Sequence, residues 1–195
     1  MENIIEKILT SSLESSDAFI RKNASELGAV AEKIASAFLR DCKLLICGNG
    51  GSAADAQHMA AEFVNRFQLE RPPLPAMALT TDTSVITSIG NDYSFEEIFS
   101  KQVKALGTKG DVLLAISTSG ESKNVIFAVE VAKKQGIYTV GLLGGDGGKL
   151  SALVDMAIIA KGDVTARVQE AHLLAEHIIC YLVDYILFQR QLEGD

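Results

Sequence analysis

Apolar and polar positions between residues 43 and 160 alternate between two kinds of segment. Five short runs are apolar on both faces, as expected for strands of a parallel sheet covered on both sides. Amphipathic segments lie between them, such as residues 122–135, which end at the helix-stopping Gly136. The repeating strand–helix order predicts an α/β fold with a doubly wound, mostly parallel five-stranded sheet. The predicted strands are residues 43–48, 75–79, 111–116, 137–142 and 156–160.

Two helical stretches flank this region. Residues 2–41 predict one long helix or two shorter ones, and residues 165–192 predict a long C-terminal helix. The C-terminal stretch is apolar over more than one stripe, so we expect it to be sandwiched between other elements or to lie at a subunit interface. Residues 1–195 contain no repeat or linker that would divide them. They therefore predict a single domain with a helical extension over residues 1–41.

Composition narrows the possible partners. The chain has 195 residues, 48% hydrophobic and 22% charged, as in an ordinary globular protein. Its net charge of −7 and the absence of a basic block argue against nucleic acid and anionic membranes as partners. The N-terminal residues lack the pattern of a secretory signal, and the three cysteines are unpatterned, so we expect a cytoplasmic protein. An anionic substrate would have to be held locally, by backbone N–H groups and hydroxyls.

Two predicted strand ends carry sequences suited to phosphate. Residues 47–52, CGNGGS, follow the first strand and open a helix, for which Ser52 is the predicted N-cap. Residues 117–122, STSGES, follow the third strand and offer four hydroxyls at a helix N-terminus. Either loop alone could be only a turn and a cap, but the two together favour phosphate. The first loop matches neither the dinucleotide fingerprint nor the P-loop, which argues against both nucleotide functions.

The helix after the first loop carries candidate catalytic groups. His58, Glu62 and Arg66 are spaced i, i+4, i+8 and would form one polar stripe near that loop. A histidine and a glutamate one turn apart can share a divalent metal. Such a pair is, however, more often an exposed pair of side chains. Both interpretations stay open at this point.

A second polar cluster lies on the apolar C-terminal helix. For His172 we expect solvent exposure or a structural hydrogen bond, and for His177 a functional partner. Gln169 and His177 are eight residues apart, about 12 Å along a continuous helix. They can share one metal only if their side chains lean together, if the helix begins near Gln169, or if neighbouring subunits contribute.

Taken together, these motifs resemble the phosphoheptose isomerases of the sugar isomerase (SIS) domain superfamily, over essentially the whole chain. Both loops mark the superfamily only, whereas the set His58, Glu62, Gln169 and His177 is more specific. The resemblance implies a flavodoxin-like or Rossmann-like SIS domain. The matching motifs are CGNGGS, His58-x-x-x-Glu62, Gly90-Asn91-Asp92, STSGxS, Arg167-Val-Gln169-Glu170 and His177.

The resemblance implies an enzyme that converts sedoheptulose 7-phosphate to D-glycero-D-manno-heptose 7-phosphate, a lipopolysaccharide precursor, through a cis-enediol. It implies a homotetramer with active sites at subunit interfaces, in which residues 1–41 serve oligomerisation. One zinc per subunit would be held by His58, Glu62, Gln169 and His177, with Glu62 as base and His177 as acid/base partner. The expected substrate-binding residues are Asn49, Gly50, Gly51, Ser52, Glu62, Arg66, Asn91, Asp92, Ser117, Thr118, Ser119, Ser122 and Gln169.

The chain departs from the family at one visible place and has two alternatives. Ala166 stands where some members carry an aspartate, so a substrate contact from that aspartate is absent. A paralogous, non-enzymatic tetramer binds the bacterial replication initiator but lacks the Glu and the second His, so Glu62 and His177 favour the enzyme. Sugar-phosphate-sensing SIS modules usually accompany a DNA-binding domain, for which 195 residues leave no room.

Overall fold

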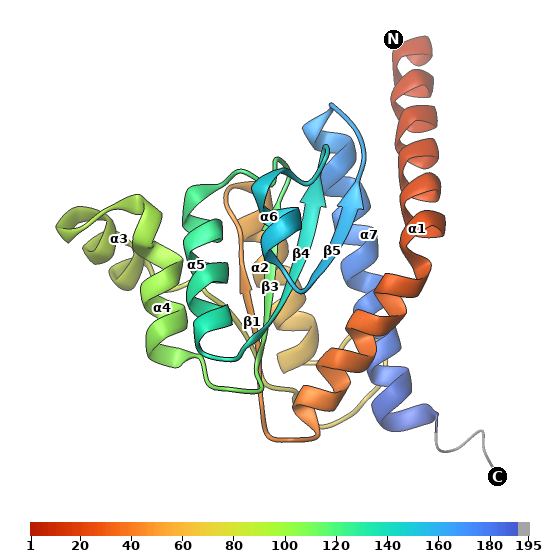
Figure 1. Cartoon of the computed structure of the whole chain (residues 1–195). Helices are drawn as coiled ribbons and strands as arrows, with labels where there is room; N and C mark the ends of the chain where they lie inside the picture. Colours follow the sequence, from red (N-terminus) through yellow and green to blue (C-terminus); the bar gives the residue numbers. More distant parts are fainter. Residues whose placement is uncertain (191–195) are drawn as a thin grey trace.

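The computed structural model describes residues 1–190 and contains one five-stranded sheet with strand order β2-β1-β3-β4-β5 (Figure 1). Every neighbouring pair of strands is parallel, so the predicted α/β architecture is confirmed. All five predicted strands are present, with the edge strand β2 reduced to three residues. The strands are β1 Leu44–Cys47, β2 Ala76–Ala78, β3 Val112–Ser117, β4 Tyr138–Gly144 and β5 Met156–Ala160.

Helices cover both faces of the sheet (Figure 1). One layer contains α1, α2 and α7, and the other contains α4, α5 and α6. The short helix α3 lies outside these layers and has no buried residue. The helices are α1 Glu2–Phe38, α2 Gly51–Val64, α3 Thr83–Asp92, α4 Ile98–Leu106, α5 Lys123–Lys134, α6 Gly148–Leu153 and α7 Thr165–Asp184, with a 3-10 turn at Phe95–Glu97 and a π-helical turn at Tyr185–Gln189.

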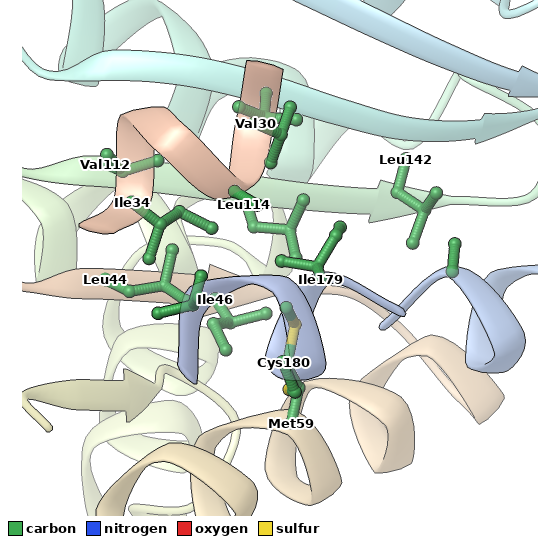
Figure 2. Close-up of a cluster of buried hydrophobic side chains, with 14 of the residues drawn as sticks. Val30, Ile34, Leu44, Ile46, Met59, Val112, Leu114, Leu142, Ile179 and Cys180 are labelled. Carbon is green, nitrogen blue, oxygen red and sulfur yellow. The ribbon is translucent and has the colours of Figure 1, made fainter. Parts of the chain in front are cut away.

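Alternate residues of each strand supply the two cores. In β1, Leu44 and Ile46 face the layer of α1, α2 and α7, where Ile34 and Ile179 meet them (Figure 2). Leu45, on the same strand, faces the opposite layer. Because successive strand side chains point to opposite faces, a strand buried on both sides becomes a continuous apolar run. This is why the strands could be predicted from short apolar runs.

Residues 2–38 form one long helix with a single non-helical residue, Asn23, at which the helix is kinked. The side chain of Asn23 donates a hydrogen bond to the carbonyl of Phe19 at 2.8 Å. The second half of α1 packs on the sheet, while the first half extends beyond it (Figure 1). That first half exposes a row of large apolar side chains, namely Ile4, Ile5, Ile8, Leu9 and Leu13. Its role in oligomerisation stays a prediction.

The C-terminal helix is sandwiched, as one of the two alternatives predicted. α7 packs against α1 and α2, with its Ala171, Ala175, Ile179 and Val183 stripe fully buried. By length and composition alone, Thr165–Gln189 could cross a membrane. Its apolar stripe instead forms part of the core, which accounts for that composition. Residues 191 and 192 of the predicted helix lie outside the described residues.

His172 connects α7 to the sheet. Its buried ring places Nε2 3.0 Å from the carbonyl oxygen of Leu143, and Nδ1 has no hydrogen-bond partner among residues 1–190. Burial lowers the pKa of His172 from 6.5 to about 4, although the hydrogen bond to Leu143 opposes this shift. The structural hydrogen bond expected for this residue is confirmed.

This histidine should make the protein sensitive to acid. Its pKa is lower in the folded state, so its stabilising contribution is complete above about pH 6.5 and is lost as pH falls toward 4. The loss should approach roughly 3 kcal/mol over that window. In urea unfolding at several pH values, His172→Gln should remove this part of the pH dependence. An unchanged slope between pH 6.5 and 4 would show that His172 is not responsible.

Candidate active site

The two glycine- and serine-containing loops meet at the carboxyl edge of the sheet. They follow β1 and β3, which pair directly, and from β1 the chain continues to β2 on its other side. Ligands of open α/β sheets bind at such a switch point. Asn49 of the first loop and Asn124 of α5 exchange two side-chain hydrogen bonds, at 2.9 and 2.8 Å. Asn124 was not among the predicted residues, although it lies two residues after the second loop.

The first loop corrects one prediction. The N-cap of α2 is Gly50, not Ser52, and Gly50 has a φ of 56°. Glycine adopts this left-handed conformation without the steric penalty of a side chain. Ser52 lies within the first turn and is buried beneath Gly48, where a Cβ would lie only 2.7 Å from the Cβ of Ser52. The glycines therefore leave the backbone N–H groups of the loop accessible.

The second loop is organised by its own hydroxyls. The Ser117 and Ser122 hydroxyls lie 3.1 Å apart, and the Gly120 N–H donates to Ser117 Oγ at 3.1 Å. The Glu121 N–H donates to Ser119 Oγ at 3.2 Å. Ser122 is the N-cap residue of α5. Hydroxyls and N–H groups thus gather at a helix N-terminus, an arrangement that can accept an anion.

Two histidines from distant parts of the chain face each other between α2 and α7. His58 lies on α2 and His177 on α7, with their Nε2 atoms 2.8 Å apart. Glu62 Oε1 lies 3.7 Å from His58 Nε2. At this separation the Nε2–H of one imidazole donates to the Nε2 of the other. The structure therefore brings together three of the four predicted metal ligands, His58, Glu62 and His177.

Gln169, the fourth predicted metal ligand, also lies where α7 packs against α2, but nearer to the beginning of both helices. Its side-chain amide packs on the backbone of Gly51, where any Cβ would collide with it. α7 is continuous from Thr165, so the idea that the helix begins near Gln169 is wrong. Gln169 contacts the first turn of α2, and His177 contacts the turn that carries His58. α2 and α7 thus run side by side in the same direction.

The chemical types of the four predicted ligands suit zinc, but the distance between the two histidines is too short for it. Two imidazoles, a carboxylate and an amide oxygen are all donors that a divalent metal accepts. Tetrahedral ligands at zinc–nitrogen distances lie about 3.3 Å apart, whereas the two Nε2 atoms are 2.8 Å apart. Among residues 1–190, no three His, Cys, Asp or Glu side chains are arranged as a ready-made metal cluster. A metal would require the two histidines to separate by about half an ångström.

Three predicted substrate-binding residues, Arg66, Asn91 and Asp92, belong neither to the two loops nor to the cluster of His58, Glu62 and His177. α2 ends at Val64, so Arg66 does not continue the helical stripe, and it pairs with Glu70 at 3.5 Å. The prediction of one stripe is wrong for Arg66. Asn91 and Asp92 are exposed at the end of α3, with Asn91 Nδ2 donating to Asp92 Oδ1 at 2.9 Å. Within the part of the chain that the structure describes, their hydrogen bonds do not reach the histidine pair.

The prediction missed a buried carboxyl next to His177. Glu176 is fully buried, and neither of its oxygens has a hydrogen-bond partner among residues 1–190. Burial, followed by the nearby charge of Asp55, raises the pKa of Glu176 to about 9. Burial also raises the pKa of Asp55 on α2, while His58 lowers it. Glu176 is therefore neutral at pH 7. Its position in an apolar helix was a signal that could have identified it.

Glu176 should make the protein less stable as pH rises. Its pKa is higher in the folded state, so stability is complete below about pH 4.5 and is lost as pH rises toward 9. Glu176→Gln should therefore raise the free energy of unfolding by a few kcal/mol at pH 8 and by much less at pH 5. The exposed Glu130→Gln serves as a control in urea unfolding. An equal effect of Glu176→Gln at both pH values would contradict this account.

Comparisons with known proteins identify the family of this chain. The SIS domain family model matches residues 9–144. The phosphoheptose isomerase of Nitratidesulfovibrio vulgaris is 53% identical over 176 residues, covering 90% of this chain and 85% of the relative. That of Clostridium acetobutylicum is 47% identical, covering 99% and 100%. The structure of the phosphoheptose isomerase from Neisseria gonorrhoeae matches with a TM-score of 0.89 and 42% identity, covering 94% of this chain and 98% of that one. The predicted resemblance is thus confirmed, and the chain belongs to the phosphoheptose isomerase family of SIS-domain proteins.

Proposed function

We propose that this isomerase converts sedoheptulose 7-phosphate to D-glycero-D-manno-heptose 7-phosphate by aldose–ketose isomerisation. The observation that carries the proposal is the meeting of His58, Glu62 and His177 on α2 and α7, where α2 begins at a loop suited to phosphate. The name shared by the relatives supports the same substrate class. Through this activity the enzyme would supply the heptose of lipopolysaccharide.

The side chains divide the chemistry between them. The open-chain ketose loses a proton from C1, passes through a cis-enediol and is reprotonated at C2. Glu62, a partly exposed carboxylate, acts as the base for the carbon-bound proton. His177 moves the proton between the two oxygens as acid/base partner. Glu62 lies on α2 and His177 on α7, so the two proton-transfer roles are carried by different helices.

The phosphate is held by backbone N–H groups and hydroxyls rather than by a lysine or arginine. This choice suits a site at two helix N-termini, where the macrodipole favours an anion. The Gln169 side chain packs on Gly51 of the first loop from α7, which supports its assignment to the substrate. The residues assigned to the substrate by this proposal are Asn49, Gly50, Gly51, Ser52, Ser117, Thr118, Ser119, Ser122 and Gln169.

We further assign zinc to His58, Glu62, Gln169 and His177, one ion per subunit. When bound, zinc would polarise the substrate carbonyl. The loop residues would orient the sugar, and Glu62 and His177 would move its protons. Binding would replace the direct hydrogen bond between the two histidines, and it would require both rings to be neutral.

A cytoplasmic homotetramer is the proposed assembly. The exposed apolar row on the first half of α1 supports burial against other subunits. Asn91 and Asp92 lie on the projecting helix α3, from which we infer that they serve the site of a neighbouring subunit. Arg66 is exposed after the end of α2, and we likewise infer that it contacts substrate in the site of a neighbouring subunit. The alternative, a non-enzymatic tetramer that binds the replication initiator, is disfavoured because Glu62 and His177 are both present.

Glu62→Gln tests the assignment of the base. The amide keeps the shape and one ligating oxygen but removes basicity. We expect kcat for sedoheptulose 7-phosphate to fall at least about 10²-fold, with fold and assembly intact. The measurements are isomerisation kinetics, bound zinc and sedimentation of the purified protein.

The same experiment separates the alternatives. If Glu62 only holds zinc, the loss of activity should follow metal content and recover when zinc is added. Near-normal kcat in Glu62→Gln would refute its role as base. A wild-type protein without isomerase activity that binds the replication initiator would favour the non-enzymatic alternative.

A further inference from the structure

Arg71 is a buried cation outside the proposed catalytic set. It lies in the loop between α2 and β2, and its side chain is 1% exposed. Its Nε donates to Asp184 Oδ1 on α7 at 2.9 Å. Its Nη atoms donate to four backbone carbonyls, those of Glu62, Phe63, Asn65 and Pro72, at 2.9, 2.7, 3.3 and 3.2 Å. One guanidinium thus binds the end of α2, the loop after it and α7.

The end of α2 needs such a partner. The last carbonyls of a helix lack N–H donors within the helix and carry the negative end of its dipole. The last turn of α2 contains no basic residue. Arg71 supplies both the donors and the positive charge from a later position in the chain. Because a buried guanidinium is stable only when it is paired, Asp184 completes the arrangement.

This arrangement connects the two helices that carry the catalytic pair. Asp184 lies seven residues after His177 on α7, which is two helical turns, so both side chains lie on the same face. On α2, the carbonyl of Glu62 itself accepts a hydrogen bond from Arg71. The contact therefore links the backbone of the proposed base to the helix face that carries its partner.

The loop held by Arg71 also reaches His177 directly. The Phe67 ring stacks on the His177 ring, with centroids 5.5 Å apart and planes 29° apart. The His58 ring contacts His177 as well, at 5.1 Å and 68°. The imidazole of His177 is thus enclosed between two rings, of which Phe67 depends on the loop that Arg71 fixes at Asn65 and Pro72.

We propose that Arg71 is a positioning residue for the isomerase reaction. Through Asp184 it holds the end of α2 against α7, two turns after His177, and so sets the spacing of the helices that carry Glu62 and His177. Through Phe67 it fixes the orientation of the His177 ring. The proposal rests on the catalytic roles proposed above for Glu62 and His177. Arg71 touches neither of those side chains and takes no part in the proton transfers.

Arg71→Lys tests the proposal, since lysine keeps the charge but its single ammonium cannot bind the α2 carbonyls and Asp184 together. We expect kcat to fall roughly 10- to 100-fold, corrected for the folded fraction, while KM changes less than about threefold. KM is preserved because the phosphate loops lie at the other end of α2. Phe67→Leu, which removes only the ring contact, should lower kcat by a smaller factor, about three- to tenfold.

A matched control comes from another buried ion pair. Lys43 Nζ and Asp111 Oδ2 lie 2.8 Å apart, before β1 and β3 and therefore at the opposite edge of the sheet. Asp111→Asn should lower stability but leave kcat at the wild-type value. A fall in kcat for Asp111→Asn equal to that for Arg71→Lys would overturn the positioning role, because any loss of stability would then have the same effect.

A second readout is independent of catalysis. The chain has three histidines, so protein labelled with ¹³C at histidine Cε1 should give a simple NMR spectrum, and His177→Asn identifies one signal. Arg71→Lys and Phe67→Leu should both shift the His177 signal, and Asp111→Asn should not. An unmoved signal or a wild-type kcat in Arg71→Lys would refute the proposal. If Glu62→Gln stays fully active, the proposed base fails separately, and the His177 signal still decides whether Arg71 positions that ring.

Discussion

The packing of α2 against α7 is the contact on which the whole site depends. It joins the helices at three successive levels: Gln169 on Gly51, His177 on His58, and Asp184 with Arg71 at the end of α2. Both helices follow strands of the same parallel sheet, so they run in the same direction and keep this register. Met59 and Cys180 occupy the apolar side of the contact (Figure 2). The sheet thus determines which functional side chains meet.

The same contact gathers acidic side chains in a buried region, where their ionised forms are least favourable. Burial raises the pKa of Cys180, and the charges of Glu176, Glu62 and Asp184 raise it further, while Arg71 opposes them. Three acidic side chains thus raise the pKa of Cys180, and a fourth, Asp55, raises the pKa of Glu176 beside them. An apolar residue at Glu176 would be more stable by ordinary packing rules. Such departures from stable packing are expected at functional sites.

Sequence patterns predicted the structure correctly wherever a feature depends on one segment of the chain alone. The apolar runs predicted all five strands, and the STSGES loop was correctly located at a helix N-terminus. The spacing of His58 and Glu62 predicted their contact because both lie within one helix. The stripe failed at Arg66, since α2 ends at Val64, where Arg71 from later in the chain binds the last carbonyls. Ser52 failed as a cap because the turn requires the left-handed conformation of Gly50.

Contacts between distant segments could not be predicted from sequence in this way. Gln169 pairs with Gly51 and His177 with His58, so these two residues, eight positions apart, meet different turns of α2. The roles of Glu176 and Phe67 likewise depend on what packs against them. Periodicity along one segment contains no information about such neighbours.

A double-mutant cycle on kcat/KM across the helix contact tests the central claim most directly. The single variants are His58→Asn on α2 and His177→Asn on α7, whose Nε2 atoms lie 2.8 Å apart. If the two helices form one catalytic unit, the double variant should lose hardly more activity than the more damaging single variant, since residues that act together are strongly non-additive. Losses that simply multiply, or a double variant with near wild-type activity, would contradict this account of the site.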